Sequence, residues 1–320
     1  MPAVLAVSTG LAWLGRQGTR AIAAIVFIAI ALPPVGAVLR PFVTEAVFAL
    51  LCLAFVRVDA AALVGYVQRP ALVLAATAWT SLLLPILFGA GCLMSGLDSA
   101  WPDLLLGLML QVVAPPMMAA PAFAAVMGLD ATIVLTTLIA STALIPFTAP
   151  LFIHAFVGPT VMFSPLALGL KLFAIVAGSL LLATVIRRRA GLVLIGRYAD
   201  QINGLNILLV FVFVAAVMEN VAARFLAAPL MMIGLAVLAF ALSFALLGVT
   251  AFVFAKAGAD RALVLGLMAS QRNMGLMLAA TSGAVPDLTW IYFALAQFPI
   301  YLSPLLLSRL AQRTLADSRR

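Results

Sequence analysis

The sequence predicts an all-α protein that crosses a membrane many times, and both its composition and its hydropathy pattern point to this class. Of the 320 residues, 66% are hydrophobic and only 9% are charged, whereas soluble domains are about 45–50% apolar and about 25% charged. A water-soluble protein of this composition could not cover its own surface with polar groups, and a disordered chain needs low hydrophobicity. Both classes are therefore excluded.

The hydrophobic residues form ten long runs, and a membrane-spanning helix needs about 20 apolar residues. We predict spanning helices at approximately residues 21–39, 41–56, 70–94, 104–127, 131–157, 163–186, 205–223, 229–256, 261–280 and 287–310. Pro33 and Pro34 kink the first of these spans. Residues 1–20 are too polar and too broken by glycine to span, so they are predicted to be a cytoplasmic lead-in that can lie at the membrane interface. Residues 311–320 form a basic cytoplasmic tail.

The positive charges are distributed as in a membrane protein. The net charge is +8, and ten spans place 14 of the 18 Lys and Arg residues on the side of both termini. Arg40 and Arg224 fall on the opposite side, whereas Lys171 and Arg272 fall within spans. Because cytoplasmic loops carry the excess of basic residues, both termini are predicted to be cytoplasmic, in the plasma membrane (the inner membrane of a bacterium). The expected partner of these charges is the lipid bilayer, not nucleic acid.

The predicted spans divide evenly along the chain, five before residue 160 and five after it. An odd number of spans in each half means that the second half enters the membrane from the opposite face, which is the pattern of an inverted repeat in secondary transporters. We therefore predict a first five-helix repeat over residues 21–157 and a second, inverted one over residues 158–310.

The span predicted at 104–127 is interrupted at its centre by Pro115 and Pro116, followed by Met117. Two adjacent prolines remove two backbone donors and clash with the preceding turn. Freed carbonyls at membrane depth are tolerated only where protein or a water-filled cavity covers them. In an inverted repeat, a broken helix at the midplane marks the binding site. The alternative is a simple proline kink.

The span predicted at 261–280 has four consecutive polar residues at its centre, Ser270 to Asn273, and one of them is Arg272. An arginine near the bilayer centre costs at least about 2.5–3.5 kcal/mol, so it needs a reason to be there. It can face an anion in a substrate cavity, or it can pair with Glu219. Thr80 is a weaker candidate, because it can equally form an interhelical hydrogen bond. The candidate substrate-binding residues are Arg272, Asn273, Gln271, Ser270, Pro115, Pro116, Met117 and Thr80.

Enzyme motifs are absent from the sequence. It has one histidine, His154, two cysteines in apolar runs, Cys52 and Cys92, and no HExxH, CxxC or Walker glycine loop. No nucleophile with a base and no carboxylate pair is visible. We therefore expect no catalytic activity, no metal site and no organic cofactor.

Together the two broken spans resemble those of the bile acid/sodium symporter family. The best local match runs from the proline turn at Ala114-Pro115 to Pro150, and Arg69-Pro70, Asn273 and Gly275 match as well. The resemblance covers roughly residues 21–310. It implies two inverted five-helix repeats, with a core domain that carries two crossing unwound helices, the fourth and the ninth, beside a panel domain. It also implies a secondary transporter of a small organic anion that works by alternating access.

This chain departs from the family at the positions of its sodium ligands. The residues found there are Ala120, Pro121, Val134, Leu138, Met268, Arg272 and Thr80. The apolar side chains among them supply no oxygen ligand, so we expect no sodium at the family's two sites. Arg272 instead provides a permanent positive charge that can stabilise the same anionic substrate and the same helix ends. The alternatives are a conventional sodium symporter with relocated ligands and a membrane binding or sensor protein that does not transport.

Overall fold

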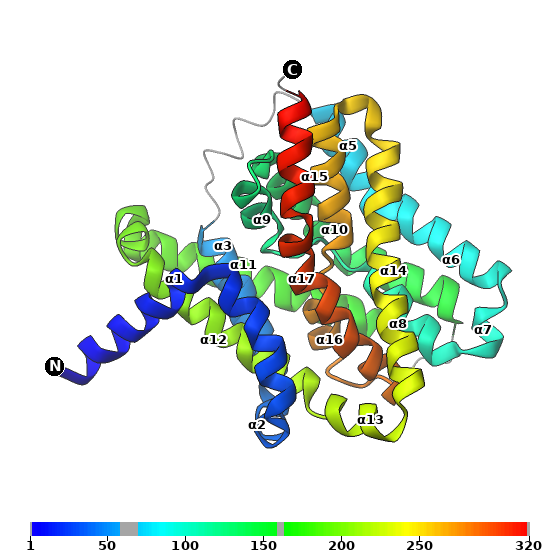
Figure 1. The fold of residues 1–320 in the computed structure, drawn as a ribbon, viewed down its shortest axis with the longest axis horizontal. Helices are drawn as coiled ribbons and strands as arrows, with labels where there is room; N and C mark the ends of the chain where they lie inside the picture. The colour runs from blue at the N-terminus through cyan, green and yellow to red at the C-terminus, as the bar shows by residue number, and fades with distance from the viewer. Residues whose placement is uncertain (1, 58–69, 159–162, 319–320) are drawn as a thin grey trace. The chain divides into compact units, whose positions relative to one another are not determined.

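The computed structural model describes residues 2–57, 70–158 and 163–318 (Figure 1). It is 89% helical, and the described residues contain no strand, so the predicted all-α class is confirmed. By length and composition, six helical runs are able to cross a membrane: Pro33–Arg57, Pro70–Met94, Ala131–Val157, Pro165–Arg197, Ala199–Ala227 and Pro229–Val253. The chain is therefore a multi-pass helical membrane protein. Helices also occupy the other predicted spans, but the number ten stays a prediction.

The chain divides into two compact units, each made of two segments that are distant in sequence. Unit 1 contains residues 1–58 and 174–232, and unit 2 contains residues 59–173 and 233–320. The segments thus alternate along the chain. Each predicted repeat contributes to both units, and the repeat boundary itself remains a prediction.

Unit 1 is built around one helix. Its elements are α1 (Pro2–Ala31), α2 (Pro33–Leu39), the 3₁₀ turn η1 (Arg40–Phe42), α3 (Val43–Arg57), the larger part of α11 (Pro165–Arg197), α12 (Ala199–Met218), α13 (Val221–Ala227) and the start of α14 (Pro229–Val253). Helices α1, α2 and α3 all pack against α12.

The N-terminal region differs from the prediction in two respects. The lead-in and the start of the first predicted span form one helix, α1, which is interrupted at Gly18 (φ 54°, ψ −131°) and ends before Pro33. Pro33 and Pro34 do not kink a helix; they occupy the first turn of α2. Proline is tolerated at this position, because the first N–H groups of a helix have no intrahelical partner.

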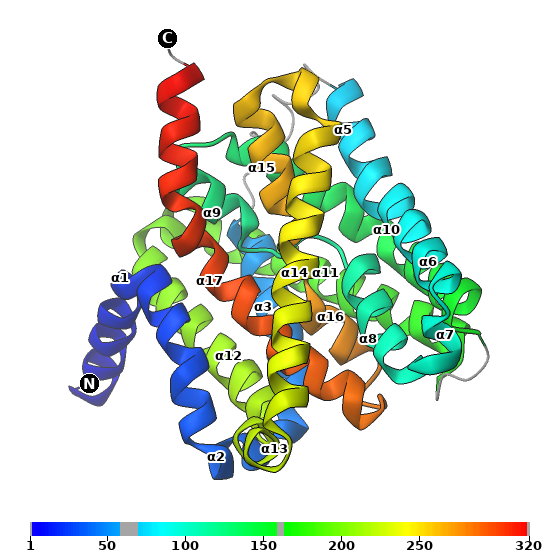
Figure 2. The ribbon, with the colours of Figure 1, turned by 45° about the vertical axis from the view of Figure 1, so that its right-hand side comes forward.

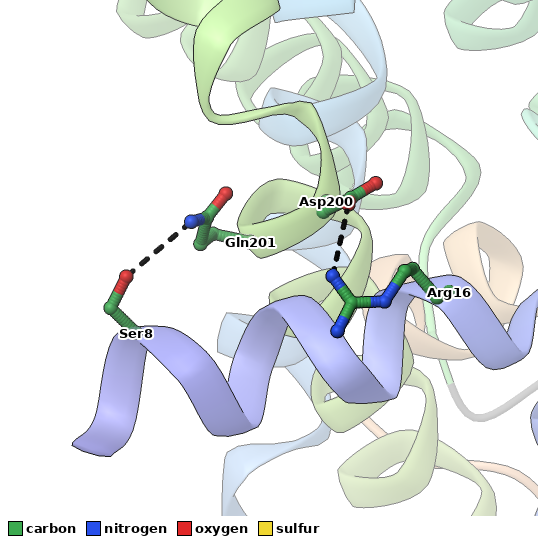
Figure 3. Close-up of polar contacts among 4 residues, drawn as sticks. All are labelled: Ser8, Arg16, Asp200 and Gln201. Carbon is green, nitrogen blue, oxygen red and sulfur yellow. Dashed lines mark hydrogen bonds and ion pairs between the residues drawn. The ribbon is translucent and has the colours of Figure 1, made fainter. Parts of the chain in front are cut away.

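The segment of α1 before Gly18, which we call the N-terminal arm, lies very close to α12 (Figure 3). A Cβ atom added at Gly15 would lie 2.0 Å from the Asp200 carbonyl oxygen. Only glycine allows the two backbones to approach this closely. Arg16 forms an ion pair with Asp200 at 3.5 Å, and the Gln201 side-chain amide donates to the Ser8 hydroxyl over 3.4 Å.

Unit 2 carries the same series of elements twice. Its first segment contains α5 (Pro70–Ala78), the π-helical turn η3 (Trp79–Leu83), α6 (Leu84–Met94), α7 (Leu97–Ala100), α8 (Pro102–Val113), α9 (Ala120–Val126), α10 (Ala131–Val157) and the start of α11. Its second segment contains most of α14, η5 (Ala255–Ala257), α15 (Ala259–Ser270), α16 (Met274–Ala280) and α17 (Asp287–Ser318).

The two series in unit 2 match in length as well as in order. A 25-residue helical run comes first in each, residues 70–94 and then α14. A 12-residue helix, a break and a 7-residue helix follow: α8 and α9 in the first series, α15 and α16 in the second. A long helix then closes each series, α10 against α8 and α9, and α17 against α8 and α15.

Candidate functional site

The first predicted break is present in the structure, between α8 and α9. Helix α8 ends at Val113, and Ala114 is extended (φ −55°, ψ 144°). The ring of a proline disfavours the helical conformation of the residue before it, so Pro115 accounts for the extended Ala114. Pro115 and Pro116 also have no N–H with which to continue the helical ladder.

The second predicted break is present as well, between α15 and α16. Helix α15 ends at Ser270, and Gln271 is extended (φ −92°, ψ 86°). The Asn273 side chain starts the next helix, because its Oδ1 atom accepts a hydrogen bond from the Leu276 N–H over 3.1 Å. Asparagine is among the best residues for this capping position. Asn273 therefore positions α16, and its amide oxygen is already occupied.

The two breaks meet and bond to each other. The Met117 N–H donates to the Gln271 carbonyl over 2.6 Å, and the Asn273 N–H donates to the Pro115 carbonyl over 2.8 Å. The central residues of the two breaks face each other as an antiparallel bridge. Helix α9 packs against α15 and α16 against α8, an arrangement that can be followed in Figures 1 and 2. The site is thus a crossing of two broken helices within unit 2.

Arg272 lies at the centre of this crossing, opposite Pro116. Its side chain is 1% exposed. Its Nε donates to the Ala269 carbonyl over 2.7 Å, and its Nη1 donates to the carbonyls of Ala114, over 2.9 Å, and Thr80, over 3.4 Å. Ala114 and Ala269 stand at the C-terminal ends of α8 and α15, where unpaired carbonyls carry partial negative charge. One guanidinium therefore binds the ends of both broken helices.

The third carbonyl, that of Thr80, lacks a main-chain donor within its own helix, and the sequence shows why. In the π-helical turn η3, the Leu84 N–H donates to the Trp79 carbonyl, five residues back. The same pairing would join the Thr80 carbonyl to residue 85, but that residue is Pro85, which has no N–H. Arg272 supplies the missing donor.

Two donors of Arg272 remain without a partner. A guanidinium has five N–H groups, and the three carbonyls use those of Nε and Nη1. Nη2 is buried and has no partner among the described residues.

The predicted alternative, a pair with Glu219, is not what the structure shows: Glu219 forms its salt bridge with Arg40, at 3.3 Å, inside unit 1.

Gln271 is the second residue of the site with buried polar atoms that lack a hydrogen-bond partner. Its side chain is 0% exposed, yet neither Nε2 nor Oε1 has a hydrogen-bond partner within the described part of the chain. A buried polar group without a partner costs about 1–3 kcal/mol. Gln271 is the residue directly before Arg272 in the same break. Two consecutive residues of the break, Gln271 and Arg272, thus have buried polar atoms without a partner among the described residues.

The other predicted site residues have their polar atoms satisfied locally. The Ser270 hydroxyl donates to the Leu267 carbonyl over 2.8 Å, and the Thr80 hydroxyl donates to the Ala76 carbonyl over 2.7 Å. Thr80 is at the site, but it contributes its carbonyl and not its hydroxyl. Met117 is half-buried and contributes its main-chain N–H.

Unit 2 contains further residues with buried polar atoms, and these residues were not predicted to belong to the site. The Tyr292 hydroxyl donates to Oε1 of Gln111, whose Nε2 has no partner among the described residues. The hydroxyls of Thr77, Thr137 and Thr142 are buried and unpartnered in the same way. The signal in the sequence is a polar side chain inside an apolar run, but it does not separate these residues from threonines that bond to their own helix.

Four of the apolar residues that the resemblance places at sodium-ligand positions are also buried. Ala120, Val134, Leu138 and Met268 are all at most 1% exposed. Their hydrocarbon and thioether side chains offer no oxygen ligand to a cation, and the carbonyls of Ala114 and Ala269 are bound by Arg272.

No protein-family model matches this chain, and no curated protein matches it. The resemblance to bile acid/sodium symporters therefore remains a prediction from the motifs.

Proposed function

We propose that this protein is a secondary transporter of a small organic anion, built on the plan of the bile acid/sodium symporters, in which Arg272 takes the place of sodium. The observation that carries the proposal is the contact set of Arg272. Its guanidinium binds three carbonyls, and each of these was freed by an interruption in a helix.

The architecture of unit 2 supports a transporter with inverted repeats. A 25-residue run, a 12-residue helix, a break, a 7-residue helix and a long helix occur in the same order in both of its segments. Transporters with inverted repeats bind their substrates where such broken helices meet at the bilayer midplane. The division of the chain into two compact units, each made of two distant segments, supports a core domain and a panel domain.

The role of Arg272 as a fixed cation follows from what sodium does at unwound helices. The carbonyls of unwound backbone and of half-helix C-termini coordinate sodium in transporters of this type. Arg272 donates to carbonyls of both kinds. A guanidinium stays protonated in proteins, so this positive charge does not have to be bound and released in each transport cycle.

We expect an anionic substrate because the positive charge of Arg272 is not balanced by its carbonyl partners. Arg272 is buried, it donates to neutral carbonyls, and its Nη2 has two N–H groups without a partner among the described residues. A buried charge is costly unless it is paired, and a carboxylate that accepts from Nη2 would pair it. Gln271, the preceding residue, offers its amide N–H groups and its carbonyl oxygen to a neutral polar group of the substrate.

A binding screen followed by a flux assay tests the proposal. The purified protein is melted with choline salts of monocarboxylates, dicarboxylates, sulfonates and phosphates, with choline chloride as the control. At least one organic anion should raise the melting temperature by mass action, and adding sodium should leave this shift unchanged. The same anion should then accumulate in proteoliposomes.

Each other outcome contradicts a defined part of the proposal. A shift that appears only with sodium would show a conventional sodium symporter with relocated ligands. A shift without flux would show a membrane binding protein that does not transport. No shift with any of the anions, in the presence or absence of sodium, would overturn the anion site itself.

A further inference from the structure

The C-terminal part of α11, which leads into α12 in unit 1, is strongly basic. We call residues 187–198 the basic elbow. Arg187, Arg188 and Arg189 precede Gly191, where α11 is interrupted (φ 75°, ψ 154°), and Arg197 follows it. The sequence of the elbow contains no acidic residue. None of these four arginines forms a salt bridge with another described residue.

The same elbow exposes a cluster of apolar side chains. Leu192 is 59% exposed, Val193 is 90% exposed and Leu194 is 44% exposed. They stand between the arginine triplet and Arg197, so charge and hydrocarbon alternate over a few residues. Basic residues beside exposed apolar ones are typical of segments that lie in the headgroup layer of a membrane.

The N-terminal arm meets the chain at the end of this elbow. Arg16 pairs with Asp200, two residues after the elbow, and Gln201 bonds to Ser8 (Figure 3). Asp200 is therefore engaged by the arm and does not neutralise the elbow. The arm adds an indole, because Trp13 is 59% exposed, and tryptophan is enriched at membrane–water interfaces.

We infer that the basic elbow, with the N-terminal arm beside it, is a binding site for an anionic phospholipid. The arginines match the headgroup phosphate, with which guanidinium groups form bidentate hydrogen bonds, and Leu192, Val193 and Leu194 match the start of the acyl chains. The inference is independent of the proposed transport, since it uses only residues of unit 1.

The number of basic residues in the elbow determines how much their replacement should weaken lipid binding. Each basic residue close to an anionic membrane surface strengthens binding about fivefold. Replacing Arg188 and Arg189, which are both exposed, should therefore weaken binding of an anionic lipid about 25-fold. A site that recognises a complete lipid should not respond in the same way to the headgroup alone.

The experiment measures the melting temperature of the full-length protein in a non-ionic detergent. The probes are dioleoyl phosphatidylglycerol, dioleoyl phosphatidylcholine and sn-glycerol 3-phosphate. Phosphatidylglycerol should raise the melting temperature more than phosphatidylcholine does, and glycerol phosphate should have no effect. The Arg188→Gln/Arg189→Gln variant should melt like the wild type without lipid and should need about 25-fold more phosphatidylglycerol for the same shift.

The matched control is Arg57→Gln/Lys256→Gln, which removes two exposed positive charges elsewhere on the face predicted to be cytoplasmic. It should keep the response of the wild type. Three outcomes would overturn the inference: equal shifts with both lipids, an unchanged response in the elbow variant, or a shift with glycerol phosphate as large as that with the lipid.

Discussion

Arg272 has two proposed roles, binding the helix ends and binding the anion. Replacing it by lysine should separate them, because lysine has fewer N–H donors than arginine. An ammonium has three N–H groups and a guanidinium has five. Three is the number of carbonyls that Arg272 binds. Arg272→Lys can therefore still serve the helix ends with a positive charge, but it has no donors left for an anion. We expect a protein that folds and binds its anion weakly.

The expected loss of anion affinity can be calculated from the hydrogen bonds that Arg272 would make to the anion. A hydrogen bond to a charged group contributes about 1.5–3 kcal/mol. If Nη2 contributes one such bond to the anion beyond the attraction between the charges, Arg272→Lys should weaken binding about 10- to 150-fold. Arg272→Gln also removes the charge and leaves at least one buried carbonyl without a donor. It should bind no anion and should lose about 1–3 kcal/mol of stability.

The assay is thermal melting of the wild type and both variants, with and without the anion that the binding screen identifies. An Arg272→Lys variant that binds the anion as tightly as the wild type would show that Nη2 is not the contact. An Arg272→Gln variant that melts at the temperature of the wild type would show that the three carbonyls do not depend on Arg272.

Four further results are expected. Gln271→Leu should raise the melting temperature of the ligand-free protein, since it removes two unpartnered buried atoms that cost about 1–3 kcal/mol each, and it should abolish the stabilisation by the anion; a lower melting temperature would contradict this. Pro115→Ala combined with Pro116→Ala should let α8 continue as a regular helix and should abolish anion binding, and unchanged affinity would show the break to be a simple kink. Glu219→Gln should leave anion binding unchanged and should cost at most about 1 kcal/mol, because its partner is a half-exposed arginine. A tag inserted after residue 192 should be protected from labelling in intact cells, like tags at both termini, and labelling from outside would contradict the predicted topology.

The two broken helices could be predicted from the sequence because their causes are local. Pro115 and Pro116 remove backbone donors wherever they stand, and four polar residues in a row interrupt any apolar helix. The bonds between the breaks could not be predicted in this way. Every residue has the same carbonyl, so nothing in the sequence distinguishes Ala114 and Ala269 as the acceptors of the Arg272 guanidinium.

The partner of Glu219 shows a second limit of local reasoning. Arg272 and Arg40 are both arginines, and Arg40 lies 179 residues from Glu219 in the chain. The choice between them is made by packing of α2 and η1 against α12, which no periodicity reveals. The π-helical turn is an intermediate case, because Pro85 signals that one carbonyl lacks a donor but does not say which side chain supplies it.

The alternation of segments between the units has a consequence for biosynthesis. Gly15 and Gly204, at the contact of the N-terminal arm with α12, are about 190 residues apart. At about 5–20 residues per second, the arm is exposed for roughly 10–40 s before its partner is translated. The carbonyls of Thr80 and Ala114 wait for a donor that is 192 and 158 residues further along the chain, because Arg272 supplies it. Neither unit can close on the N-terminal half alone, so the nascent chain stays incomplete, and open to membrane chaperones and proteases, until its last part has been inserted.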